Sequence, residues 1–254
     1  FEIVVVLDNC IDDTKEKLST ISSKINIIEH CGIDLFWAGG MLYGFQNAVV
    51  GKVYEYLICV NDDIKLDFEK TKSELNNYFK RMSNSGSAFV GSFRNQAHFT
   101  SYGALMNVSK VHPLKLRQIG PNEDQFVHTF NMNFVILPIE LISKVGFLSK
   151  QYSHSKADLD LGYRIKEANF QIIKSTEHLG SCERNLPIAS PCYDKTNLIK
   201  GLQCLNHPLC EPIKERWIFL RYHGTPGFRL VHLLMPYIIF VPRFWFYKMM
   251  KFFR

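Results

Sequence analysis

The sequence lacks several features that mark particular classes of protein. No CxxC pair occurs among its seven cysteines, and no internal repeat or low-complexity tract is visible. No uninterrupted apolar run approaches the ~20 residues that span a bilayer. An odd number of scattered cysteines argues against a disulfide framework and suits a reducing compartment. Since 46% of the residues are hydrophobic, the composition also excludes an intrinsically disordered chain.

One group of cysteines raises the question of a zinc site. Cys204, His207 and Cys210 lie close together in the sequence. A fourth ligand at the usual spacing is absent. The sequence therefore favours ordinary thiols at these positions.

The net charge of +6 is unevenly distributed. Residues 212–254 contain eight Lys or Arg and one acid, Glu215, so they carry +7 and the first 211 residues carry −1. This asymmetry predicts a basic, partner-seeking surface at the C-terminus. Nucleic acid is one such partner, but the strand-end acids described next lie where phosphate contacts would be needed, so we expect no nucleic-acid binding.

The stretch Tyr56–Asp67, YLICVNDDIKLD, is an apolar run followed by polar side chains. The run predicts a strand buried on both faces, as in parallel sheets, and ligands bind outside the carboxyl ends of such strands. Side chains alternate along a strand, so Asn61 and Asp63 are expected to share a face. Hard cations such as Mn²⁺ or Mg²⁺ prefer oxygen ligands, which makes Asp63 the main candidate metal ligand. The alternative is that these residues cap a helix starting near Phe68.

The rest of the chain alternates between strand and helix patterns. Strands are expected at Phe1–Leu7, Ile25–Glu29, Tyr56–Val60, Ala88–Phe93, Tyr102–Val108 and Phe134–Leu137, and helices at Lys15–Ser23, before Val50, at Phe68–Met82, Pro138–Lys144 and Ala157–Ala168. This order predicts an α/β fold, with a mostly parallel sheet flanked by helices.

Two further acidic positions suggest ligand or catalytic roles. Asp8 follows the first expected strand, where a carboxylate can accept hydrogen bonds from a nucleotide; its alternative role is an Asx-turn or a helix N-cap. Asp158 and Asp160 lie in the first turn of the helix Ala157–Ala168. They either complement the helix dipole or provide a general base at a helix N-terminus.

Several segments, in order, resemble inverting family-two glycosyltransferases of the GT-A fold, especially bacterial polysaccharide sugar transferases. FEIVVVLDNCIDDT resembles their VVVDNGSTDGT segment, with Cys10 and Ile11 in place of Gly-Ser, and DLFWAGGMLYGFQNAV resembles NLFWAGGMNxGI. YLICVNDDI resembles the LLNDD form of the DxD motif, TFNMNFVILPIELISKVGFL resembles GNxxLIPxxxxxxVGxF, and ADLDLGYRIKEANFQI resembles ED/DxDxGxRxxxxG. The matches cover roughly Phe1–Val241 and are more specific together than singly.

The resemblance implies a Rossmann-like GT-A catalytic domain in residues 1–211 and a role for each matching residue. Asp8, Asn9, Asn61 and Asp62 would bind the nucleotide, Asp63 would hold Mn²⁺ or Mg²⁺ on the diphosphate, and Asp158 would be the general base. Trp37, Asn133, Asp160 and Arg164 would border the sugar and acceptor pockets, the last two also orienting the helix of the base. The resemblance makes His178 an additional candidate metal ligand, with a structural role as the favoured alternative, and His223 has a counterpart without an assigned duty.

The implied activity is metal-dependent, inverting transfer of a sugar from a nucleotide-sugar donor to a hydroxyl of a glycan or lipid-linked acceptor, in surface polysaccharide synthesis. Two departures keep a catalytically inactive sugar-nucleotide-binding or assembly subunit open. Ala157 replaces a frequent Glu. Relatives also carry a preceding strand and helix with a TYNR-like segment, which we expect to be missing here.

Residues 212–254 form a separate basic, aromatic segment expected to be helical. Its longest apolar stretch, Leu233–Val241, is short, and Pro236 and Pro242 interrupt it, so a transmembrane helix is not expected. Aromatic residues interleaved with Lys and Arg predict a segment lying on an anionic membrane surface. This implies a cytoplasmic protein, peripheral on the inner face of the plasma membrane. The alternatives are a helix packed on the catalytic domain or a homodimer contact.

Overall fold

The computed structural model describes residues 1–21, 25–81, 86–123, 126–185 and 190–252. The strands are β1 (Ile3–Asp8), β2 (Ile25–His30), β3 (Tyr56–Val60), β4 (Lys65–Leu66), β5 (Ala88–Arg94), β6 (Thr100–Tyr102), β7 (Ala104–Asn107), β8 (Leu116–Gln118), β9 (Thr129–Phe130), β10 (Phe134–Pro138) and β11 (Ile172–Ser181). The helices are α1 (Thr14–Ile21), α2 (Phe36–Ala48), α3 (Phe68–Arg81), α4 (Ile139–Val145), α5 (Ala157–Glu167), α6 (Ser190–Tyr193), α7 (Leu198–Leu205), α8 (Ile213–His223) and α9 (Arg229–Phe252), with a 3-10 turn, η1 (Pro226–Phe228), before α9.

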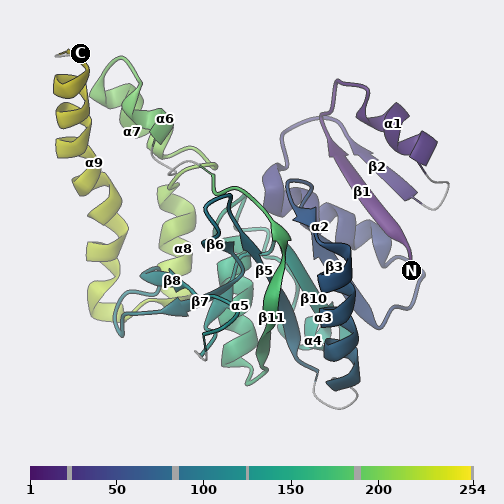
Figure 1. The fold of residues 1–254 in the computed structure, drawn as a ribbon. Helices are drawn as coiled ribbons and strands as arrows, with labels where there is room; N and C mark the ends of the chain where they lie inside the picture. Colours follow the sequence, from purple (N-terminus) through teal and green to yellow (C-terminus); the bar gives the residue numbers. More distant parts are fainter. Residues whose placement is uncertain (22–24, 82–85, 124–125, 186–189, 253–254) are drawn as a thin grey trace.

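The central sheet has the strand order β3-β10-β5-β11-β4, and β6 pairs with β5 (Figure 1). β5 and β11 are parallel, but β10 is antiparallel to both β3 and β5, and β4 is antiparallel to β11. The predicted α/β fold class is therefore confirmed, although the sheet is mixed where a mostly parallel one was expected. Parallel neighbours need a long crossover, usually a helix. Between β5 and β10, the described residues instead form the short strands β6 to β9.

β1 and β2 form a separate two-stranded parallel sheet at the N-terminal side of the molecule (Figure 1). α2 packs closely on this sheet. A Cβ added at Gly44 of α2 would lie 2.8 Å from Val6 Cγ2, so glycine permits the close approach of helix and strand. The predicted strand–loop–helix unit at the N-terminus is confirmed.

β3 is an edge strand, and the expectation that it is buried on both faces is wrong. Cys59 is buried, whereas Ile58 and Val60 are each 45% exposed. β3 stands at the end of the strand order, so one of its faces remains partly open to solvent. An apolar run alone does not distinguish an edge strand from a central one.

Two hydrophobic cores lie on opposite faces of the central sheet, and alternate residues of β10 face each of them. Val135 and Leu137 belong to the larger core, which also contains Leu161 of α5 and Phe219 of α8. The smaller core, on the face covered by α3, contains Phe89, Phe93, Phe134, Ile136, Leu179 and Tyr78. The helices therefore hold the sheet from both sides, as the α/β pattern predicts.

Several expected boundaries differ from the structure. The strand expected at Tyr102–Val108 is broken at Gly103, whose φ of +134° and 3.0 Å approach to Ser92 Cα require glycine. The chain there leaves the central sheet and enters the β8-β7-β9 sheet. The helix ends expected at Ser23 and Met82 lie outside the described residues, as do Phe253 and Arg254.

α9 is one continuous helix of 24 residues that includes Pro236 and Pro242. The expected interruption at these prolines is therefore wrong. A proline removes one hydrogen-bond donor, and here the buried side chains Phe240 and Phe244 pack the helix on its neighbours between and beyond the two prolines. By length and composition, the helix is long and apolar enough to cross a membrane. The sequence argument against spanning, which rested on a short apolar stretch, is wrong on that point.

The C-terminal helices pack across the expected boundary between residues 211 and 212. α6 and α7 contact α9 through a third core (Cys192, Leu205, Cys210, Phe240 and Phe244), while Phe219 of α8 belongs to the larger core of the central sheet. Figure 1 shows α9 along the side of the molecule opposite β1 and β2.

Candidate active site

Asn61 directly follows the last residue of β3, and a turn comes after it. Trp37 Nε1 donates to Asn61 Oδ1 at 2.9 Å, and the Asn61 amide donates to the Asn133 carbonyl at 2.9 Å. Asp62 and Asp63 are exposed and belong to the turn. β3 ends at Val60, so the alternation expected to place Asn61 and Asp63 on one face does not extend to Asp63.

The cap of α3 is Asp67, and the alternative role of Asn61–Asp63 as a helix cap is wrong. Asp67 Oδ1 accepts a hydrogen bond from the Lys70 amide at 3.2 Å. β4 lies between the turn and the helix. The acidic turn therefore sits at the strand end without serving α3.

Cys182, just after β11, connects Asp63 with Asn133. Burial raises the pKa of the Cys182 thiol to about 11, and the negative charge and hydrogen bonding of Asp63 raise it further in the same direction. Asn133 Nδ2 lies 3.8 Å from Cys182 Sγ. Sequence reasoning missed Cys182, because no motif or spacing distinguishes it from the other cysteines.

The carboxylates after β3 suit a hard divalent cation whose remaining ligands are water molecules and substrate phosphates. Asp62 and Asp63 offer exposed carboxylate oxygens, and Mg²⁺-type sites often use one or two carboxylates plus phosphates. Within the described residues, no third His, Cys, Asp or Glu joins them in a preformed cluster. His178, whose Nε2 lies 3.0 Å from Thr100 Oγ1, is engaged in a contact within the protein.

Asp8 and Asn9 join the end of β1 to the loop before α2. Asp8 Oδ2 accepts from the Leu35 amide at 2.8 Å. Asn9 donates to Asp34 Oδ1 and accepts from the Gly32 amide, both at 2.9 Å. Asp8 therefore connects the end of β1 to the loop before α2. This long-range contact is neither an Asx-turn nor a helix cap, the two alternative roles.

Trp37 lies where α2, α8 and the loop before α5 meet. The His154 ring approaches it edge-on, with the centroids 6.4 Å apart. The Ala38 amide donates to the Ser153 carbonyl at 3.1 Å, and the Ser153 amide donates to Glu215 Oε1 at 3.0 Å. Sequence reasoning did not place Glu215 here, because it comes from α8, which is distant in the sequence.

Asp158 is a buried carboxylate in the first turn of α5. Its Oδ1 accepts from the Leu159 amide at 2.8 Å, and the Met132 amide and the Asn131 side chain also hydrogen-bond to it. Burial raises the pKa of Asp158 to about 7, although these hydrogen bonds oppose the shift. A carboxylate with this pKa takes up and releases a proton near neutral pH.

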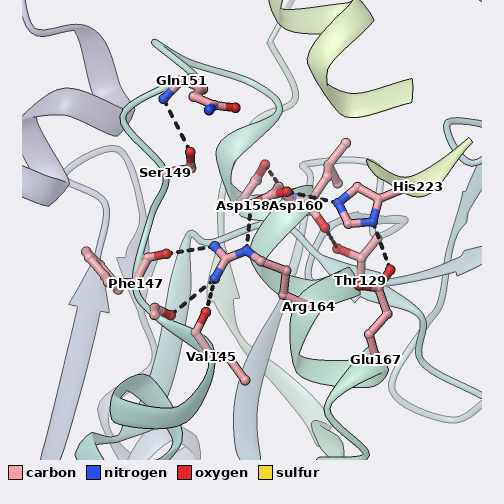
Figure 2. A network of polar contacts seen from close by, with 12 residues as sticks. Thr129, Val145, Phe147, Ser149, Gln151, Asp158, Asp160, Arg164, Glu167 and His223 are labelled. Atoms are coloured by element: carbon pink, nitrogen blue, oxygen red, sulfur yellow. Dashed lines mark hydrogen bonds and ion pairs between the residues drawn. The ribbon is translucent and has the colours of Figure 1, made fainter. Parts of the chain in front are cut away.

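Asp160 lies in a network of fixed partners (Figure 2). Its Oδ2 accepts from Arg164 Nε at 2.8 Å, and its Oδ1 lies 2.9 Å from His223 Nε2. Arg164 also donates to the Phe147 carbonyl at 2.7 Å, and His223 Nδ1 lies 3.0 Å from Glu167 Oε1. The network fixes α5 to α8 and to the segment after α4.

The pKa of Asp160 moves in the opposite direction from that of Asp158. Burial alone would raise the pKa of Asp160, but the hydrogen bond with His223 and the Arg164 charge together hold it below its usual value. Asp160 therefore stays ionised while Asp158 titrates. Two carboxylates with pKa values pushed apart can take different roles.

A second ionic network joins the start of α5 to α9. Lys156, 2% exposed, lies two residues before Asp158, and its Nζ is 3.2 Å from Glu211 Oε2. Arg216 pairs with the same Glu211 oxygen at 2.9 Å and donates through Nε to the His232 carbonyl of α9 at 2.8 Å. Lys156 was not singled out by sequence reasoning.

The structure brings most of the predicted residues into one connected group. Residues 131–133 contact Asp158 at one end and, through Asn133, both Asn61 and Cys182 at the other. Trp37 joins this group through Asn61. Asp8 and Asn9 reach it indirectly, since their contacts are with the loop that leads into α2.

No family model and no curated protein matches this chain. Among solved structures, the chain is similar to the mannosyltransferase PcManGT from Pyrobaculum calidifontis in complex with GDP-Man and Mn²⁺, at 12% identity and a TM-score of 0.51, over 91% of this chain and 58% of that one. TarS residues 1–349 from S. aureus gives 14% identity and a TM-score of 0.46 over 90% of this chain and 65% of that one, a value too low to add to the argument. This chain thus spans less than two thirds of either protein. Its mixed α/β architecture is similar to part of the fold of PcManGT.

Proposed function

We propose that this protein is a glycosyltransferase that moves a sugar from a nucleotide-sugar donor to a hydroxyl of a glycan or lipid-linked acceptor. The observation that carries the proposal is Asp158, a buried carboxylate with a pKa of about 7, connected through residues 131–133 to the acidic strand end. The fold shared with a mannosyltransferase supports it. So do the ordered motifs that resemble family-two enzymes.

In this proposal, Asp158 accepts the proton of the acceptor hydroxyl as its oxygen attacks the anomeric carbon. Base catalysis of this kind typically contributes about 10²–10⁴-fold. Asp160, held by Arg164 and His223, positions α5 and remains ionised. A single base and a single leaving-group site suit one direct displacement, which inverts the anomeric configuration.

Asp63 would hold Mn²⁺ or Mg²⁺ as the main protein ligand. The bound ion supplies neutralisation of the charge that develops on the leaving diphosphate. Asp8 and Asn9 after β1, and Asn61 and Asp62 after β3, would bind the nucleotide. Trp37 and Asn133, which contact Asn61 from two directions, would shape the pocket for the sugar and the acceptor.

A catalytically inactive sugar-nucleotide-binding or assembly subunit is the second candidate, favoured by Ala157. Ala157 is fully buried beside Asp158 in the sequence. Because alanine stands where relatives often have Glu, this position offers no carboxylate to support Asp158. Donor binding without turnover on any acceptor would favour this candidate.

We also propose that α9 lies on an anionic membrane surface at the cytoplasmic face, close to a lipid-linked acceptor. α9 carries Arg229, Arg243, Lys248 and Lys251 and no acid. Trp245 and Phe246 are 60% and 61% exposed, and further exposed apolar side chains continue along the helix (Leu230, Val231, Leu234, Ile238, Met249 and Phe252). Interleaved rings and cations are typical of helices that lie in the interface.

The contacts of α9 favour a helix that lies on the membrane surface over a helix that spans the bilayer. Its Tyr247 hydroxyl donates to Asp194 Oδ1 at 2.7 Å, and Arg216 is bonded to its His232 carbonyl. Insertion of the helix across a bilayer would carry these charged partners into the hydrocarbon or break the contacts, and either is costly.

Metal-dependent donor binding tests the catalytic proposal. Wild-type protein and Asp63→Ala are titrated with nucleotide sugars, with and without Mn²⁺, by isothermal calorimetry. We expect Asp63→Ala to abolish the Mn²⁺-dependent part of donor binding and Asp62→Ala to weaken it less. The control is Asp13→Asn, an exposed acid before α1. Unchanged Mn²⁺-dependent binding in Asp63→Ala would overturn the metal assignment.

A further inference from the structure

Three cysteine thiols converge in the C-terminal helical assembly, away from the candidate active site. Cys192 lies in α6, Cys204 in α7, and Cys210 in the segment between α7 and α8. Their sulfur atoms all lie within 4.8 Å of one another. Cys192 Sγ is 3.1 Å from Cys204 Sγ and 3.8 Å from Cys210 Sγ.

These separations are close to those around a tetrahedral zinc ion. A Zn–S bond is about 2.3 Å long, so two sulfur ligands of a tetrahedral ion stand about 3.8 Å apart. The Cys192–Cys210 separation already has this value, and the Cys192–Cys204 separation would have to lengthen by about 0.7 Å for the thiols to surround one ion. Sulfur is a soft donor, which selects zinc over the hard cations expected at Asp63.

The sequence alone did not indicate this arrangement, because Cys192 precedes Cys204 by twelve residues, outside the usual spacing. The fold supplies the third ligand by turning α6 back against α7. His207, the other candidate from the sequence, is not in the cluster. Its ring instead accepts from the Leu209 amide at 3.3 Å and lies edge-on to Phe36.

We propose that Cys192, Cys204 and Cys210 bind one zinc ion as thiolates, with water or a small external ligand in the fourth position. Cys192 and Cys210 are buried and Cys204 is half-buried, so the open position lies toward the Cys204 side. The site is distinct from the proposed Mn²⁺ or Mg²⁺ site and uses different chemistry.

The zinc ion would act as a structural clamp. Cys192 and Cys210 lie in the third core with Phe240 and Phe244 of α9, and Tyr193 stacks on Phe240 with the ring centroids 4.9 Å apart. Joining α6, α7 and the following segment at one ion fixes the surface on which α9 packs. Loss of the ion would loosen α9 before it disturbs the central sheet.

The test measures zinc in the full chain, purified under reducing conditions from zinc-supplemented medium and dialysed against a weak chelator. We expect about one zinc per chain. Cys192→Ser, Cys204→Ser and Cys210→Ser should each reduce zinc to background. The matched control is Cys10→Ser with Cys31→Ser, which removes two exposed thiols outside the cluster and should retain the ion.

A second measurement, on the wild-type chain, tests the proposal even if the serine variants fail to fold. Zinc-edge X-ray absorption on the wild-type chain should show three sulfur ligands at about 2.3 Å. An absorption spectrum with oxygen and nitrogen ligands only would overturn the proposal. So would zinc content that is unchanged in folded Cys variants.

Discussion

Asp158 and Asp160 are two residues apart on one helix, yet their surroundings move their pKa values in opposite directions. Among the described residues, Asp158 receives hydrogen bonds from amide groups and no cation is among the main influences on its pKa, so burial dominates. Asp160 meets Arg164 and His223, whose hydrogen bonds and charge outweigh its burial. The sequence showed two acids in a first turn, and only the packing of α8 and residues 131–133 tells them apart.

The raised pKa of Asp158 predicts the pH dependence of transfer. A general base must be deprotonated, so kcat/KM should fall about tenfold per pH unit below about 7 and level off above it. Asp158→Asn should lower kcat by about 10²–10⁴-fold while leaving donor affinity little changed. Steady-state kinetics from pH 5 to 9 test both. Retained turnover in Asp158→Asn would move the role to another group.

The buried Asp158 carboxylate also predicts that a neutral substitution at this position stabilises the fold. Its folded-state pKa of about 7 lies above the ordinary value of 3.8, so between these values the native state keeps a proton that the unfolded chain has lost. Its contribution to stability therefore decreases as pH rises through this window and is constant above it. Asp158→Asn should raise the free energy of unfolding at pH 8 by on the order of 1–3 kcal/mol, and by less at pH 5.

Urea denaturation at the two pH values measures this difference. The conservative variant Asp160→Asn is the comparison, since it removes an ionised partner of Arg164 and should destabilise the fold. A loss of stability in Asp158→Asn at pH 8 would show that its charged form is not penalised by burial.

At the scale of elements, the strands and helices with strong periodicity were predictable and their pairing was not. Tyr56–Val60 and Phe134–Leu137 both read as strands, but nothing in either run states that they are antiparallel neighbours. β11 was missed because IIKSTEHLGS is mostly polar, and its pairing with β5 is irregular between Lys174 and Gly180. Likewise, Cys182, Glu215 and Cys192 reach their sites from distant segments that carry no local pattern.

α5 packs closely on β9 at Gly162. A Cβ there would lie 2.2 Å from Thr129 Oγ1 and 2.7 Å from Thr129 Cα. Gly162→Ala should therefore push α5 away from β9 and destabilise the fold by about 1–3 kcal/mol. It should also lower kcat, because Asp158 is carried on the same helix.

The matched control for Gly162→Ala is Gly40→Ala, the same substitution in another helix, α2. No atom lies within 4 Å of the position its Cβ would take, so alanine should stabilise the fold by up to about 1 kcal/mol. Thermal or urea denaturation measures both variants. Equal stability of Gly162→Ala and wild type would show that α5 can shift without cost.

At the scale of the whole molecule, the proposed catalytic group and the proposed membrane surface lie on different helices of one folded unit. α9 presents exposed rings and cations on one side and buries Phe240 and Phe244 on the other. The sequence identified the basic, aromatic character of this segment. It did not reveal that the two prolines lie within one continuous helix.

The intact protein should co-sediment with anionic liposomes at low salt. Each cation near the surface adds about 1 kcal/mol, and the exposed rings add apolar burial. Trp245→Ser with Phe246→Ser should greatly reduce binding without disturbing the packed side of α9. Phe68→Ser with Phe99→Ser, two exposed aromatics outside α9, should leave it unchanged. Equal binding by both pairs would rule out α9 as the contact.

An ionic path connects α9 with Lys156, at the start of the helix that bears Asp158. His232 accepts from Arg216, Arg216 pairs with Glu211, and Glu211 pairs with Lys156 at the start of the helix that bears Asp158. A surface that tilts α9 would act on this path and change the position of the base. Such linkage is reciprocal, so donor binding would change lipid affinity by the same factor. The enzyme would then be an interfacially activated one, with its turnover set by attachment.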